Sequence, residues 1–64
     1  MNAHTKAQLA LEESGYLFYR HGKSHDIYFN PQLKAMIPLK RHDFDEDDLR
    51  YIQKEIKQNR GGKK

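Results

Sequence analysis

Small and apolar residues recur at helical spacing near the start of the chain. This spacing predicts a helix over residues 4–14, with Thr5 as its candidate N-cap and Gly15 as its left-handed stop. Leu9 lies on the opposite side of the helical wheel, where it is either simply exposed or part of a partner-binding face. The predicted inner stripe consists of Ala3, Ala7, Ala10, Leu11 and Ser14.

Three short runs of strand-forming residues follow this helix, separated by turn residues. Aromatic and β-branched side chains favour strands over residues 16–21, 25–29 and 34–39. Gly-Lys-Ser at residues 22–24 and Asn-Pro-Gln at residues 30–32 are turn sequences between them. Pro38 has no N–H to donate to a ladder, so it is expected on an edge strand or at a strand end.

The C-terminal part of the chain has the pattern of an amphipathic helix. Leu49, Ile52 and Ile56 repeat at intervals of three and four residues and form an apolar face. Asp43 or Asp45 is the candidate N-cap, and the acids around them face the positive end of the helix dipole. We interpret this acidic run as the start of a helix and not as a metal site. Its members are Asp43, Asp45, Glu46, Asp47 and Asp48.

The order of these elements predicts an α+β fold with αβββα topology. We expect a three-stranded antiparallel sheet with both helices on one face, an order that the double-stranded-RNA-binding domain shares. Residues 1–60 form the expected single domain, and residues 61–64 a flexible basic tail. The other face of the sheet and the turn at residues 22–24 then stay open to a ligand.

The charge of the chain is unevenly distributed. Its 64 residues carry a formal net charge of +3. The absence of cysteine fits a reducing cytoplasm. No apolar run suits a signal peptide or a membrane span. Between residues 20 and 41 there is one acid, Asp26, against five cations. This local excess predicts a polyanionic ligand, of which nucleic acid is the first candidate. The cations are Arg20, Lys23, Lys34, Lys40 and Arg41.

His25 is the best candidate for acid–base chemistry, because histidine is the side chain suited to proton transfer near neutral pH and this one follows a turn flanked by cations. The alternative is a turn histidine that only bonds to backbone. His21, His25 and His42 also raise the question of a metal site. We expect no metal and no cofactor, since Gly22 breaks any helix that would bring His21 and His25 together, and no acid or cysteine completes a ligand set.

The chain resembles the HicA family, the toxins of type II toxin–antitoxin modules, over nearly its whole length. The resemblance rests on Glu13-Ser14-Gly15, Arg20, the turn residues Gly22, Ser24 and His25, Pro38, the segment Lys40-Arg41-His42, and the helix at residues 49–56. It implies a double-stranded-RNA-binding-domain-like fold, mRNA interferase activity with His25 as the catalytic residue, and neutralisation by a HicB-like antitoxin. Lys23 between Gly22 and Ser24 departs from the family pattern, and so does the wide spacing of Pro38 and His42.

The leading hypothesis is therefore a cytoplasmic, metal-independent endoribonuclease that cleaves mRNA and inhibits translation and growth. The runner-up is a non-catalytic RNA-binding module of the same fold, and a third class is a purely structural partner of another protein. The expected partners are mRNA and the antitoxin, with DNA contacted only through the antitoxin and no membrane. The expected phosphate-binding residues are Arg20, Lys23, Ser24, Lys40 and Arg41, and His42 is a candidate auxiliary residue.

Overall fold

The computed structural model describes residues 1–61 and begins with α1 (Ala3–Glu13). The Asn2 side chain caps this helix by accepting a hydrogen bond of 2.8 Å from the Thr5 N–H. The prediction of Thr5 as the cap is therefore wrong, because Thr5 lies within the first turn. Ala3, Ala7 and Leu11 are buried, as the periodicity predicted.

Gly15 ends α1 in the left-handed conformation, with φ of +92°. The N–H of Tyr16 donates to Leu11 O at 2.9 Å and that of Gly15 to Glu12 O at 3.1 Å, which is the Schellman arrangement. Tyr16 and Leu11 are both fully buried, so the same turn places the first large aromatic residue in the core. The Tyr16 hydroxyl accepts a hydrogen bond from Asn59 Nδ2 at 3.0 Å.

Three antiparallel strands, β1 (Leu17–His21), β2 (His25–Asn30) and β3 (Ala35–Lys40), form a sheet in the order β1-β2-β3. Pro38 lies on β3, an edge strand, as predicted. The register shifts between Phe18 and Arg20, which leaves Tyr19 in a β-bulge. His21 thus lies opposite Asp26, and its ring packs 4.9 Å from that of Phe18.

The turn between β2 and β3 is organised by Asn30, a buried polar residue. Its Oδ1 accepts hydrogen bonds from the N–H groups of Gln32 and Leu33, at 2.9 and 3.0 Å. Its Nδ2 donates to Ser14 O at 3.0 Å and so joins this turn to the end of α1. Lys34 has a positive φ of 55° and belongs to the turn, so β3 begins one residue later than predicted.

The last element is α2 (Glu46–Gly61), which begins with a reciprocal cap. Asp45 Oδ1 accepts from the N–H groups of Asp47 and Asp48, and Asp48 Oδ2 accepts from the Asp45 N–H. Of the two predicted caps, Asp43 and Asp45, the structure uses Asp45. The helix includes Gly61, where the predicted flexible tail begins, and residues 62–64 lie outside the described part, so the tail stays a prediction.

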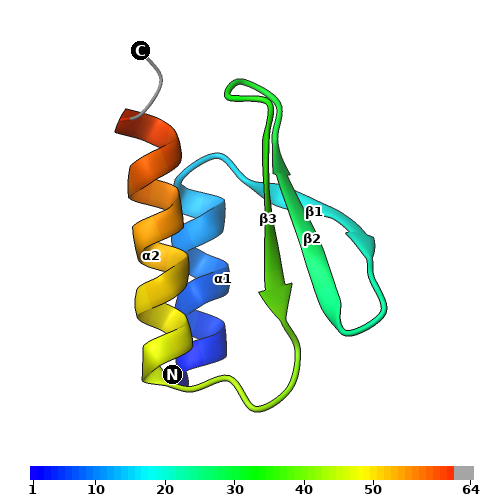
Figure 1. Cartoon of the computed structure of the whole chain (residues 1–64), viewed down its shortest axis with the longest axis vertical. Helices are drawn as coiled ribbons and strands as arrows, with labels where there is room; N and C mark the ends of the chain where they lie inside the picture. The colour runs from blue at the N-terminus through cyan, green and yellow to red at the C-terminus, as the bar shows by residue number, and fades with distance from the viewer. Residues whose placement is uncertain (62–64) are drawn as a thin grey trace.

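Both helices lie side by side on one face of the open sheet, as Figure 1 shows. The predicted αβββα architecture is confirmed, whereas its likeness to the double-stranded-RNA-binding domain stays a prediction. The turn between β1 and β2, the connection from β3 to α2 and the start of α2 all lie at one end of the molecule (Figure 1). The buried core consists of Ala3, Ala7, Leu11, Tyr16, Tyr28, Ile37, Leu39, Leu49, Ile52 and Ile56.

Candidate functional site

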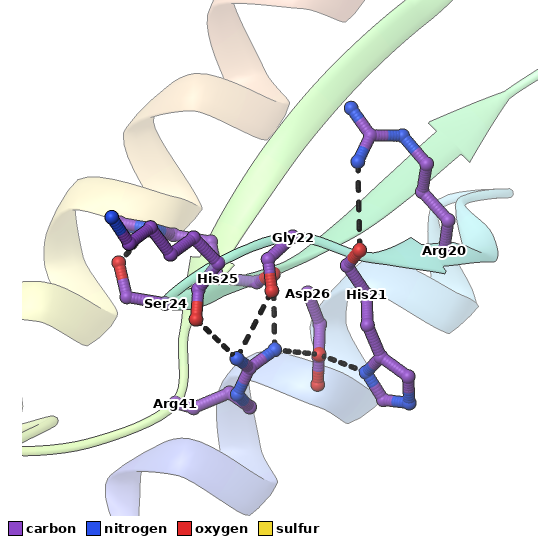
Figure 2. A network of polar contacts seen from close by, with 8 residues as sticks. Arg20, His21, Gly22, Ser24, His25, Asp26 and Arg41 are labelled. Atoms are coloured by element: carbon purple, nitrogen blue, oxygen red, sulfur yellow. Dashed lines mark hydrogen bonds and ion pairs between the residues drawn. The ribbon is translucent and has the colours of Figure 1, made fainter.

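The side chain of Arg41 holds the turn between β1 and β2 in place (Figure 2). Arg41 Nη2 donates to the carbonyls of Gly22 and Lys23 at 3.0 and 2.7 Å. Its Nη1 donates to His25 O at 3.2 Å and to Asp26 Oδ1 at 2.8 Å. We call these four bonds the Arg41 clamp, and residues 21–25 the histidine turn. The planar guanidinium fork fixes three carbonyls of this turn at once.

Asp26 is the anionic centre beneath the histidine turn. Its carboxylate accepts a hydrogen bond from His21 Nδ1 at 2.8 Å in addition to that from Arg41, and its side chain is only 14% exposed. Desolvation is the largest single influence and acts to raise the pKa of Asp26. The hydrogen bonds from His21 and Arg41 together outweigh it and hold the pKa below its usual 3.8. Asp26 therefore remains a carboxylate in the folded protein at neutral pH.

His25 is half-buried at the start of β2, where its backbone pairs with Lys40 of β3. Ser24 Oγ and His25 Nδ1 lie 3.2 Å apart and share a hydrogen bond. The direction of this bond sets the tautomer of the imidazole and hence whether Nε2 carries a proton. Nδ1 is thus engaged with Ser24, and Nε2 is the ring nitrogen left without a hydrogen bond to residues 1–61.

Gly22 is required by the close approach of two backbone segments. Its N–H donates to His25 O at 2.6 Å, and a Cβ at this position would lie 2.9 Å from the same carbonyl oxygen. A backbone carbonyl that Arg41 also binds has little freedom to move away. Glycine thus allows the chain to fold back tightly just before His25.

The predicted phosphate-binding residues have unequal surroundings. Lys23 is exposed at the tip of the histidine turn, and Arg20 is exposed with Nη1 donating weakly to His21 O at 3.5 Å. Lys40 forms an ion pair of 3.1 Å with Asp48 at the start of α2. Arg41 is directed into the protein by its clamp. The structure brings these cations to the end of the molecule that carries His25, and their contact with phosphate stays a prediction.

The remaining histidines of the predicted site lie apart from His25. The His21 imidazole is directed toward Asp26, as Figure 2 shows, while His42 is exposed in the connection to α2. Within residues 1–61, no three side chains of the histidine, cysteine, aspartate or glutamate type are grouped as a metal site needs. The auxiliary function of His42 stays a prediction.

A small open pocket lies beside His25, between the end of β3 and the first turns of α2. We call it the His25 pocket. His25, Pro38 and Lys40 form its sheet side. Phe44, Asp48, Tyr51 and the buried Ile52 form its helix side. Its volume is about 180 Å³, smaller than the roughly 300–1,000 Å³ of pockets that hold drug-sized ligands.

Sequence reasoning missed three parts of this site: the acceptor function of Asp26, and the pocket residues Phe44 and Tyr51. Asp26 follows His25 directly, so its position was visible, but no local pattern names Arg41 as its partner. Sequence periodicity offered one signal for Tyr51, because this aromatic residue falls outside the apolar stripe of α2. In the structure its side chain is 55% exposed.

Comparisons with protein-family models, with curated proteins and with solved structures give no match for this chain. The resemblance to the HicA toxins therefore rests on the residues quoted above. No helix among residues 1–61 is long and apolar enough to cross a membrane.

Proposed function

We propose that this protein is an mRNA interferase toxin of the HicA type, a metal-independent endoribonuclease with His25 as its catalytic residue. The observation that carries this proposal is the placement of His25. Its imidazole is held by Ser24 on a turn that the Arg41 clamp fixes, and it borders an open pocket among exposed cations.

The chemistry follows from RNA itself, because the 2′-hydroxyl supplies the nucleophile. Its oxygen forms a bond to phosphorus while the bond from phosphorus to the 5′-oxygen breaks, and one proton moves from the 2′-hydroxyl to the leaving oxygen. His25 either takes the proton from the 2′-hydroxyl as a base or gives a proton to the leaving 5′-oxygen as an acid, and water carries out the other transfer. A single acid–base residue predicts modest catalysis.

Positive charge near the phosphorane is the second requirement of this reaction. Lys23 lies in the histidine turn and Arg20 on the neighbouring strand β1, and both are exposed. Lys40 lines the pocket next to His25. These cations would act where negative charge develops in the transition state and would attract the RNA backbone from a distance. Arg41 supports them indirectly by holding the turn.

The direct test is RNA cleavage in the presence of EDTA by the wild type and by His25→Gln. Glutamine can keep a hydrogen bond to Ser24 but cannot exchange a proton near neutral pH. We expect EDTA-resistant cleavage by the wild type and a loss of about 100-fold or more in the variant. Circular dichroism of both proteins checks that the fold is unchanged. Full cleavage by His25→Gln would disprove the catalytic assignment.

The runner-up, a non-catalytic RNA-binding module, is favoured by the exposed cations alone. It predicts RNA binding without cleavage by either protein in the same assay.

We further propose a HicB-like antitoxin as the natural inhibitor. A partner that presented carboxylates to the histidine turn would match its positive charge and exclude RNA in the same act. Contact with DNA would then come only through the antitoxin, and the toxin itself would act on mRNA in the cytoplasm.

A further inference from the structure

The His25 pocket has walls that suit a flat aromatic ring. Phe44 and Tyr51 contribute two aromatic side chains, and Pro38 and Ile52 add apolar surface. Phe44 is held from behind by His4, whose ring packs edge-on at a centroid distance of 5.3 Å. Phe44 also packs against the buried core, so the fold supports this wall of the pocket.

The Tyr51 side chain is not part of the buried core of the fold. It is 55% exposed on α2, although the neighbouring Ile52 is 2% exposed in the core. An exposed aromatic ring that borders a pocket is available to stack on a ligand. The other strongly exposed tyrosine, Tyr19 at 57%, lies in the bulge of β1 and does not line this pocket.

The polar side of the pocket offers a donor beside an acceptor. Lys40 Nζ lies 3.1 Å from Asp48 Oδ2, and both residues line the pocket. The Asp48 carboxylate stays ionised, because a hydrogen bond from the Asp45 backbone, aided by Lys40, lowers its pKa from the usual 3.8. A nucleobase edge presents donors next to acceptors and can pair with such a couple.

We propose that the His25 pocket binds one unstacked nucleobase of single-stranded RNA, stacked on Tyr51 and hydrogen-bonded to the Lys40–Asp48 pair. The inference rests on the proposed function, because His25 forms one wall of the pocket and would act on the phosphate next to this base. The pocket volume suits a single ring system and not a longer ligand. Tyr51 is then a substrate-binding residue that selects where the RNA is cut.

The test uses RNA that cannot react. A fully 2′-O-methylated oligonucleotide lacks the nucleophile, and an abasic chain of equal length keeps the phosphate charge but has no bases. We expect the wild type to bind the base-containing oligonucleotide more tightly, and Tyr51→Ala to reduce this preference by about 5- to 100-fold. Tyr51→Phe keeps the ring and should retain the preference.

Tyr19→Ala is the matched control, since it removes an equally exposed tyrosine far from the pocket. It should leave the preference for base-containing RNA unchanged. An unchanged preference in Tyr51→Ala, or a loss in Tyr19→Ala alone, would overturn the proposal, and the second result would place the bases on the sheet. In the wild type, the ring signals of Phe44 and Tyr51 should shift in NMR spectra with the base-containing chain and not with the abasic one.

Failure of the proposed endoribonuclease function and failure of the pocket proposal give different experimental results. If no RNA is cleaved, but the base preference depends on Tyr51, the pocket proposal stands and the endoribonuclease is wrong. If His25→Gln abolishes cleavage while Tyr51→Ala keeps the base preference, the endoribonuclease stands and the pocket proposal is wrong.

Discussion

The guanidinium of Arg41 organises the histidine turn through bonds that a simple charge cannot replace. It is 28% exposed, and its two terminal nitrogens each donate to two acceptors. Such a fork fixes geometry as well as charge. Arg41 therefore acts through the position of His25 and belongs to the positioning residues of the site.

Arg41→Lys separates these two contributions, because lysine keeps the positive charge but presents a single ammonium group. We expect cleavage to fall about 10- to 100-fold, since a displacement of about 1 Å in a catalytic group can cost this much. The salt dependence of RNA affinity should stay as in the wild type. The measurements are initial rates of cleavage and affinities across a salt series.

Lys23→Ala is the control for charge, because Arg41 binds only the backbone carbonyl of this exposed lysine, which alanine keeps. Its log–log salt slope should fall by about 0.7 for one lost contact to a single strand. Normal cleavage by Arg41→Lys would contradict the positioning function of the clamp.

The Asp26 carboxylate predicts a pH dependence of stability at the acid side. Its folded-state pKa lies below the value of the unfolded chain, so the unfolded state binds the proton more tightly. The contribution of Asp26 is complete above about pH 4 and is lost as the pH falls through the folded-state pKa. Urea unfolding between pH 6 and about pH 2 should show a steeper loss of stability in the wild type than in Asp26→Asn. Parallel pH curves for the two proteins would disprove this linkage.

At the scale of elements, Asn30 joins the turn between β2 and β3 to the end of α1. Alanine at this position would leave Ser14 O and two backbone N–H groups without these partners. We expect Asn30→Ala to lower the free energy of unfolding by about 1–3 kcal/mol, measured by urea denaturation. Gln53→Ala removes an exposed amide from α2 and should change stability by less than about 0.5 kcal/mol. Equal stabilities of the two variants would show that the Asn30 bonds contribute nothing.

At the scale of the whole molecule, the histidine turn and the cations beside it form the surface we expect an antitoxin to cover. Hydrogen exchange with and without the partner should show new protection over residues 20–25 and 40–41, with a weaker effect near Leu9. The melting temperature should rise, because the partner binds only the folded state. Protection confined to α2 from Lys57 onward would rule out occlusion of the histidine turn.

The sequence by itself determined the elements and their inner faces. Ala3, Ala7 and Leu11 on α1, and Leu49 and Ile56 on α2, are buried where their spacing placed them. These features depend on neighbours a few residues away, so local periodicity and capping preferences are sufficient to predict them. The N-cap of α1 was assigned incorrectly because Asn2 and Thr5 are both capable caps, and the local sequence does not say which one begins the helix.

Only the tertiary structure decided how the site is assembled. Strand alternation alone would put His21 on the opposite face from Phe18, but the bulge at Tyr19 moves it to the same face and brings it to Asp26. Arg41 reaches carbonyls 16 to 19 residues earlier in the chain. A polar residue can satisfy its hydrogen bonds with many partners, and nothing in its own neighbourhood selects one. The path of the folded backbone makes that selection, which is why His25 was predictable as a candidate and its supports were not.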